Sequence, residues 1–126
     1  NADTIYILPN NSNIILAAEQ ATHLAEGKNI IVVDDMIDTA GTICKAADML
    51  IDNGAASVRA VATHAVLSGK AYENIEKSKL TEVIFTDSIP QKQPCSKIKV
   101  LPIAPMFADT IRNIYEHKSI SDHFLM

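Results

Sequence analysis

The sequence lacks an excess of positive charge and lacks any long hydrophobic run. Its formal net charge is −4, from 15 acidic and 11 basic side chains. Proteins that bind nucleic acid or an anionic membrane surface carry a basic patch, and no apolar run here approaches the length of a membrane span. We therefore expect neither nucleic acid nor a membrane among the partners of this protein.

The sequence also has only two cysteines, Cys44 and Cys95, which lie far apart and follow no metal-binding spacing. Free thiols are the rule in a reducing compartment, so we predict two unpaired cysteines and a cytoplasmic protein. The 126 residues, 48% of them hydrophobic, suit a single globular domain over residues 1–126 rather than a disordered chain.

Residues 30–42, which read IIVVDDMIDTAGT, are the most informative stretch of the chain. Ile30–Val33 predict a strand that is buried on both faces of a sheet. The acidic pair Asp34 and Asp35 is expected at the end of that strand. A short polar turn follows over residues 38–42, and a helical pattern begins within it.

This order of strand, acidic pair, turn and helix predicts a site for an anion. Backbone N–H groups of the turn and of the first helical turn would converge there, and the helix dipole favours negative charge. Gly41 would let the backbone approach a ligand closely, and two threonines could add hydroxyl donors. The carboxylates would repel an anion, but they suit sugar hydroxyls or a divalent cation. The predicted site residues are Asp34, Asp35, Asp38, Thr39, Ala40, Gly41 and Thr42.

The expected ligands are phosphate, sulfate or ribose 5-phosphate, because a phosphate at one end and a diol at the other describe a phosphorylated ribose. The alternative is a buried strand followed by an Asp that caps a helix, with no ligand at all.

Strand-like and helix-like patterns alternate along the whole chain. This alternation predicts an α/β fold, a three-layer α/β/α sandwich with helices on both faces of a mainly parallel five-stranded sheet. The order of the strands stays open, because the first strand could lie beside the second or across the sheet. The predicted strands are 4–8, 30–33, 57–63, 81–86 and 97–101, and the predicted helices are 14–26, 39–53, 70–78 and one that opens at Pro105.

Three of these helices carry apolar residues at helical spacing. Gly27 and Gly54 are expected to end the first two helices, and residues 10–13 offer several candidate N-caps for the first. The apolar sets are Ile14, Ile15, Ala18, Ala21, Leu24 and Ala25 in the first helix, Ile43, Ala46, Ala47, Leu50 and Ile51 in the second, and Phe107, Ala108, Ile111, Ile114 and Tyr115 in the last.

The same stretch, residues 30–42, resembles the phosphoribosyl pyrophosphate loop of type I phosphoribosyltransferases, and most closely that of the ribose-phosphate pyrophosphokinase family. The resemblance continues through AVATHAVLSG (60–69), TDSIP (86–90) and the helix after Pro105, and so covers about residues 29–126. It implies a phosphoribosyltransferase-like sheet, with a flavodoxin-like sheet as the alternative.

The resemblance also implies roles for the site residues. Asp34 and Asp35 would hold the ribose hydroxyls, and Asp38–Thr42 would hold the 5-phosphate. Members of this family use Mg²⁺ and move a diphosphate from ATP to ribose 5-phosphate, and they build the ATP site largely from an N-terminal half and from neighbouring subunits.

Residues 1–29 depart from that family, because the expected glycine-rich turn and basic loop are missing. Residues 4–26, notably ILPNNSNIILAAEQA, instead resemble a segment of the dihydroxyacetone-kinase-like fatty acid kinase family. Two ancestries that meet near residues 27–30 predict an engineered chimera, with a βα unit at 1–29 and a phosphoribosyltransferase-like part at 30–126. An isolated domain with an unusual N-terminus is the alternative.

This departure removes the cations that the reaction needs. We therefore expect no catalysis and no required cofactor, but a phosphate-binding turn that survives. The alternatives are a stable scaffold without a ligand, a functional fragment of ribose-phosphate diphosphokinase, or a receiver-like phospho-acceptor domain. A receiver domain also ends a strand in Asp-Asp, but its third strand should end in Asp, where this chain has Thr63-His64.

Three further expectations concern single residues and the surface. His64 is expected to be a loop histidine near the ligand side of the sheet, and Ser68 is expected to cap the following helix. The apolar residues at 124–126, Phe-Leu-Met, are expected to be exposed and to drive dimerisation, so a second copy of the chain is a further candidate partner.

Overall fold

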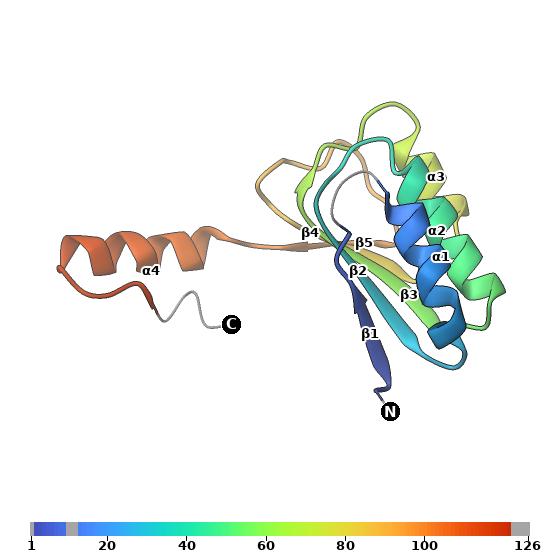
Figure 1. Cartoon of the computed structure of the whole chain (residues 1–126). Helices are drawn as coiled ribbons and strands as arrows, with labels where there is room; N and C mark the ends of the chain where they lie inside the picture. Colours follow the sequence, from blue (N-terminus) through green and yellow to red (C-terminus); the bar gives the residue numbers. More distant parts are fainter. Residues whose placement is uncertain (1, 10–12, 122–126) are drawn as a thin grey trace.

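The computed structural model describes residues 2–9 and 13–121 and shows a five-stranded sheet with four helices (Figure 1). All paired strands are parallel, in the order β1-β2-β3-β4-β5. The first strand therefore lies beside the second. The elements are β1 (Thr4–Ile7), α1 (Ile14–Ala25), β2 (Asn29–Ile37), α2 (Gly41–Asp52), β3 (Ser57–Ala65), α3 (Ala71–Lys77), β4 (Glu82–Thr86), β5 (Ile98–Leu101) and α4 (Ala104–Tyr115).

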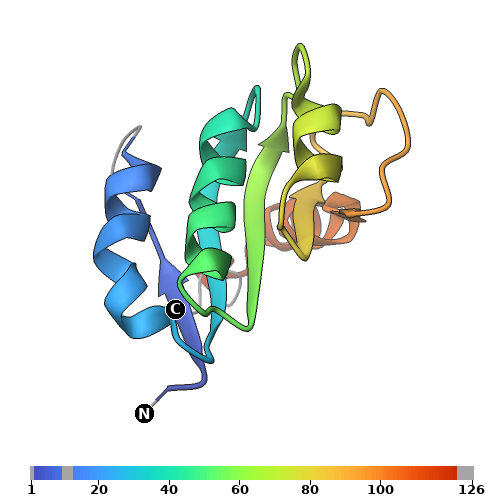
Figure 2. The ribbon, with the colours of Figure 1, turned by 90° about the vertical axis from the view of Figure 1, so that its right-hand side faces the viewer.

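The α/β class and the parallel five-stranded sheet are confirmed, but the helices do not cover both faces. Figures 1 and 2 show α1, α2 and α3 together on one face of the sheet, and α4 projecting away on the other side. Each new strand is added on the same side of the previous one, so right-handed crossovers place successive helices on the same face. The third layer of the expected sandwich is therefore missing from the described part of the chain.

The core lies between the sheet and these three helices. In β2, Ile30 and Val32 are fully buried beneath the helices, whereas Ile31 and Val33 face the other side and stay half-buried. The expectation that this strand is buried on both faces is therefore wrong. The largest fully buried side chains are Phe85, Ile30, Leu50, Ile75, Leu80, Val32, Val58 and Val83.

The residues predicted to face the core are buried more completely in α2 than in α1. In α2 the predicted residues are buried except Ile51, which is only partly buried. In α1, Ile15 and Leu24 are exposed, at 38% and 65%. The sequence pattern placed them inward, but α1 lies above the edge strand, so only a narrow stripe that includes Ile14 and Ala18 reaches the core.

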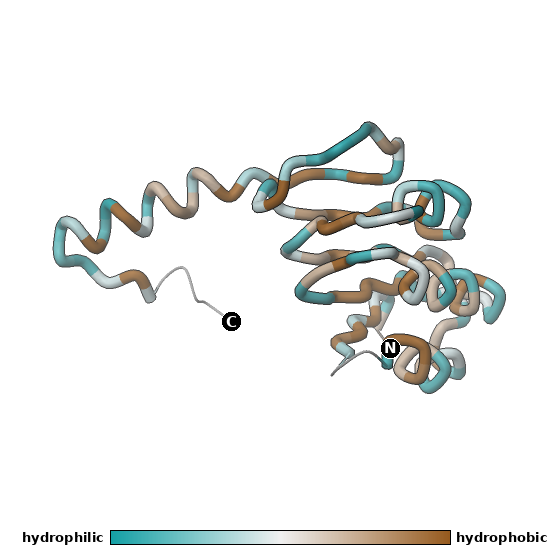
Figure 3. Tube along the Cα trace, turned by 90° about the horizontal axis from the view of Figure 1, so that it is seen from above, coloured by the Kyte–Doolittle hydropathy of each residue, from teal (hydrophilic) through white to brown (hydrophobic). Residues whose placement is uncertain are grey.

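The predicted apolar face of α4 exists but stays exposed in the part of the chain that the structure describes. Among the described residues of this helix none is buried, and Phe107 and Ile111 are 53% and 65% exposed. Figure 3 shows hydrophobic positions recurring along the projecting helix. Two earlier expectations fall outside the described residues: the N-caps at Asn10, Asn11 and Ser12, and the apolar C-terminal residues Phe124, Leu125 and Met126.

Other general features agree with the sequence. Cys44 is buried in α2 and Cys95 lies in a loop, and both are free. Burial raises the pKa of both thiols. No helix within residues 2–9 and 13–121 is long and apolar enough to cross a membrane.

The two turns at the lower end of the sheet depend on glycine. Gly27 and Gly54 have φ of +69° and +92°, and the Gly27 N–H donates to the Gly54 carbonyl at 2.8 Å. These residues end α1 and α2 as the sequence predicts.

Substitution of Gly54 by Ala is expected to lower the free energy of unfolding by about 1–2 kcal/mol, because a Cβ disfavours this left-handed conformation by about that amount. Gly41→Ala is the matched control. Gly41 has no positive φ, and a Cβ there would meet only the Thr39 hydroxyl, at 3.8 Å. Its stability should be unchanged or higher by about 0.4–1 kcal/mol. Urea denaturation of both variants measures the difference in the free energy of unfolding. Equal losses for the two variants would contradict the role given to the left-handed conformation of Gly54.

Candidate functional site

The strand that carries the acidic pair is longer than expected. β2 continues through Asp34 and Asp35 to Ile37, because its pairing with β3 continues to Ile37 opposite Ala65. The expectation that the strand ends at the acidic pair is therefore wrong. The turn occupies residues 38–40, and α2 begins at Gly41 rather than at Thr39.

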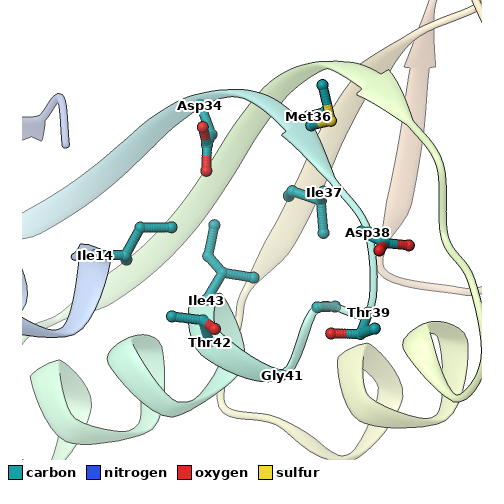
Figure 4. Close-up of a pocket in the computed structure, with 10 residues that line it drawn as sticks. Ile14, Asp34, Met36, Ile37, Asp38, Thr39, Gly41, Thr42 and Ile43 are labelled. Carbon is teal, nitrogen blue, oxygen red and sulfur yellow. The ribbon is translucent and has the colours of Figure 1, made fainter. Parts of the chain in front are cut away.

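A cavity of about 180 Å³ opens at this turn. It lies at the carboxyl end of β2, where ligands bind in open α/β sheets. Figure 4 shows the Asp34 side chain of β2 at one end of the cavity and the start of α2 at the other end. The cavity is lined by Ile14, Asp34, Met36, Ile37, Asp38, Thr39, Ala40, Gly41, Thr42 and Ile43.

The cavity includes six of the seven predicted site residues, because Asp34 and Asp35 point to different sides of β2. Asp34 points into the cavity (Figure 4), whereas Asp35 is exposed and does not line it. The Asp34 carboxylate accepts a hydrogen bond from the Asp35 N–H at 2.9 Å, and the Asp35 carboxylate accepts one from the Met36 N–H at 2.8 Å.

Burial raises the pKa of the Asp34 carboxyl. The bond from the Asp35 N–H opposes this rise, and the nearby Asp35 carboxylate adds to it. Asp34 is thus a partly desolvated hydrogen-bond acceptor in the cavity. A hydrogen-bond donor that binds there would favour the ionised form of its carboxyl group.

The first turn of α2 offers unpaired backbone donors. The first hydrogen bond into the helix runs from the Cys44 N–H to the Ala40 carbonyl at 3.0 Å, and no side chain of the described residues caps this end. The N–H groups of Gly41, Thr42 and Ile43 precede that bond, which is the arrangement that binds anions at a helix start.

The left-handed residue of the turn is Ala40, not Gly41. Ala40 has φ of +59° and is 5% exposed. Gly41 is not required by the backbone conformation, and a Cβ at this position would find space in the free protein. The backbone conformation and the packing of the free protein therefore give no reason for a glycine at this position.

Two residues that sequence reasoning did not assign to the site hold the turn in place. The Ser68 hydroxyl donates to the Asp38 carboxylate, and the Ser68 N–H donates to the Asp38 carbonyl at 3.1 Å. The Asn74 side chain donates to the Thr39 carbonyl at 2.9 Å. Ser68 does not cap α3, whose N-cap is Lys70 without a side-chain bond. The sequence signal that could have pointed to Ser68 is the family-like motif at residues 60–69, which contains it.

His64 lies in β3, not in a loop, and does not line the cavity. Its Nδ1 is 2.9 Å from the Ser88 hydroxyl, which in turn donates to the Thr63 carbonyl at 3.0 Å. Within residues 2–9 and 13–121 no group of three or more His, Cys, Asp or Glu side chains is placed to hold a metal ion.

Comparison with known proteins gives the family. A family model described as phosphoribosyl synthetase-associated domain matches residues 22–125. The chain belongs to this family. Its strand, acidic pair and turn at 30–42 lie wholly within the matched region, as the sequence resemblance implied.

Curated relatives of this phosphoribosyl synthetase-associated domain are ribose-phosphate pyrophosphokinases. The protein of Wolinella succinogenes is 53% identical over 100 residues, which cover 79% of this chain and 32% of the relative. The protein of Helicobacter hepaticus is 56% identical over 99 residues, with 79% and 32% covered. The chain thus spans about a third of the length of the relatives it matches.

A solved structure extends the likeness beyond the sequence match. The phosphoribosylpyrophosphate synthetase of Mycobacterium smegmatis superimposes with a TM-score of 0.75 at 32% identity, over 91% of this chain and 46% of that chain. The resemblance of residues 4–26 to the fatty acid kinase family and the chimeric origin stay predictions.

Proposed function

We propose that this domain binds the phosphate of ribose 5-phosphate at the turn of residues 38–42, with inorganic phosphate and sulfate as simpler ligands. The observation that carries the proposal is the uncapped start of α2 in the wall of the cavity. The three leading N–H groups and the helix dipole favour an anion there. No acidic side chain lies in the first turn of α2, and the Asp38 carboxylate in the preceding turn is held by the Ser68 hydroxyl.

The other end of the cavity suits a sugar diol. Asp34 is a carboxylate that accepts hydrogen bonds, and hydroxyl groups are the donors that a sugar supplies. Asp35 lies outside the cavity, so we assign the main acceptor role to Asp34. Mg²⁺ usually binds through one or two carboxylates together with substrate phosphates, and Asp34 and Asp38, which both line the cavity, would supply such carboxylates beside a phosphorylated ligand.

The family supports this ligand class. The curated relatives are named ribose-phosphate pyrophosphokinases, and the turn lies in the part of the chain that matches them. We further infer that residues 1–29 have a separate origin. The support for this inference is that residues 1–21 lie outside the family model, which begins at residue 22, and that the curated relatives match only 79% of the chain.

Binding is expected without help from the rest of a synthetase. Titration of the chain with inorganic phosphate and with ribose 5-phosphate in a calorimeter should show one site for each ligand. At 100 times its Kd, a ligand should also raise the free energy of unfolding by about 2.7 kcal/mol. Gly41→Val should weaken both ligands together, because its side chain blocks backbone approach. A stably folded chain that shows neither heat nor stabilisation would be a scaffold without a ligand site.

The isolated chain is expected to form no phosphoribosyl pyrophosphate from ATP and ribose 5-phosphate. Among the described residues no Lys or Arg lines the cavity, and transfer of a diphosphate requires cations around the developing charge. A coupled assay with Mg²⁺ should not exceed the buffer blank. Turnover that is lost on Asp34→Ala would overturn this expectation and favour a functional fragment.

A further inference from the structure

The turn proposed to bind phosphate carries a negative group of its own. We call residues 38–42 the phosphate turn. Asp38 opens this turn, borders the cavity and precedes both the left-handed Ala40 and the start of α2. A carboxylate that approached a bound phosphate would repel it. It would also compete with the phosphate for the leading N–H groups of α2, because Asp side chains accept hydrogen bonds at helix starts. The direction of this side chain therefore affects whether an anion binds.

A serine from the loop after β3 holds the Asp38 carboxylate. The Ser68 hydroxyl donates to that carboxylate, and the Ser68 N–H donates to the Asp38 carbonyl at 3.1 Å. The neighbouring Leu67 N–H donates to the Ile37 carbonyl at 3.1 Å, which fastens the same loop to the end of β2. Figure 4 shows the Asp38 side chain pointing away from Asp34 and from the start of α2. Among the described residues, the Ser68 hydroxyl is the side-chain donor that fixes this direction.

The backbone carbonyls of the phosphate turn are also held by partners outside it. The Asp38 carbonyl accepts the Ser68 N–H, and the Thr39 carbonyl accepts the Asn74 side chain of α3 at 2.9 Å. In a trans peptide the N–H points opposite to the carbonyl, so the N–H groups of Thr39 and Ala40 point away from these partners. Neither N–H donates a hydrogen bond to a described residue. They continue into the unpaired N–H groups of α2, and successive N–H groups of this kind form a concave anion site.

We propose that Ser68 and Asn74 are positioning residues of the phosphate turn. Ser68 keeps the Asp38 carboxylate away from the anion, and Asn74 fixes the Thr39 carbonyl so that the next N–H is free for the ligand. Neither side chain lines the cavity, so both act through the turn and not by touching the phosphate. This inference rests on the proposed function, because it concerns the same anion. It predicts that Ser68 changes the affinity for any oxyanion but not the preference between phosphate and ribose 5-phosphate, which depends on Asp34.

Calorimetric titration with inorganic phosphate, without divalent cations, tests the role of Ser68. Ser68→Ala should raise the Kd about 10-fold, because the released carboxylate then approaches the anion or the helix start. Ser68→Thr keeps the hydroxyl and should restore most of the affinity. Ser96→Ala is the matched control. The Ser96 hydroxyl also donates to a carboxylate, that of Glu76 at 3.0 Å, but it lies outside the cavity, so the Kd should be unchanged.

Removal of the Asp38 charge separates repulsion from a loss of shape. Ser68→Ala combined with Asp38→Asn should return the Kd for phosphate to within about threefold of the wild-type value, because no released carboxylate is left to repel the anion. A double variant that binds as weakly as Ser68→Ala would show that Ser68 only shapes the turn. Asn74→Ala should also weaken phosphate, but Asp38→Asn should not rescue it, because Asn74 acts on the Thr39 carbonyl.

The outcomes distinguish this inference from the proposed function. A wild-type chain that binds no phosphate contradicts both. A wild-type chain that binds phosphate, together with an unchanged Kd in Ser68→Ala, contradicts only the positioning role. A selective loss of ribose 5-phosphate in Ser68→Ala also contradicts it, because the effect would then lie at the sugar end. Urea denaturation checks that each variant is folded. Should Ser68→Ala not fold, Ser68→Cys takes its place, because a thiol fills the same site but is a weak donor.

Discussion

Asp34→Asn is expected to weaken ribose 5-phosphate binding by about 1–3 kcal/mol relative to inorganic phosphate, the range for charge-assisted hydrogen bonds. Asp34 and Asp38 both line the cavity, and the Asp38 carboxylate already accepts a hydrogen bond from the Ser68 hydroxyl. A neutral amide at position 34 accepts hydrogen bonds from a diol less strongly than a carboxylate does. Affinity for inorganic phosphate should be unchanged or slightly higher, because a nearby negative charge is removed. Calorimetric titration of wild type and variant with both ligands measures the difference.

Asp35→Asn is the matched control for this experiment. Its carboxylate accepts the Met36 N–H and lies outside the cavity, so its loss for ribose 5-phosphate should be much smaller. The double variant should resemble Asp34→Asn. Equal losses for both ligands in Asp34→Asn would mean that the carboxylate only maintains the shape of the loop, and equal effects of the two single variants would contradict the division of roles.

Leu50→Ala is expected to lower the free energy of unfolding by about 2–5 kcal/mol, the cost of removing a fully buried leucine and leaving a cavity. Leu50 is fully buried between α2 and the sheet. Leu24→Ala should cost far less, within about 0.5 kcal/mol, because Leu24 is 65% exposed on α1. Both leucines lie on helix faces that the sequence predicts to be apolar. A difference between the two variants therefore reports burial in the tertiary structure and not the sequence pattern.

Urea denaturation followed by circular dichroism measures both changes. The denaturant slope should stay constant, since a change in slope would report a different unfolded or native state rather than a lost contact. A large loss for Leu24→Ala would mean that α1 buries its outer face against a further surface.

Local features of the sequence predicted the elements and their order. The strands and helices begin and end within a few residues of their predicted bounds except β2, which extends four residues further. Short-range chemistry explains this success, because hydrophobic periodicity and glycine turns such as Gly27 and Gly54 act over a few neighbouring residues. The same short-range patterns predicted a turn after the acidic strand followed by a helix, and the helix begins at Gly41, two residues later than predicted.

The partners of that turn could not be predicted in the same way. Ser68 and Asn74 lie 30 and 35 residues beyond the groups they contact, and only the pairing of β2 with β3 and the packing of α3 bring them there. Likewise, adjacent Asp34 and Asp35 look equivalent in the sequence. The path of β2 through both residues places one in the cavity and leaves the other in solvent.

The sequence by itself determined an α/β protein with a parallel sheet, a turn between the acidic strand and the next helix, free cysteines and an amphipathic last helix. Only the tertiary structure decided the strand order, the placement of α1–α3 on one face, and the separation of α4 from its own sheet. The physical reason is that an apolar stripe on a helix predicts that the helix packs on something, but it does not show which surface it packs on. That surface depends on strand order and crossover hand, which arise only when distant segments pair.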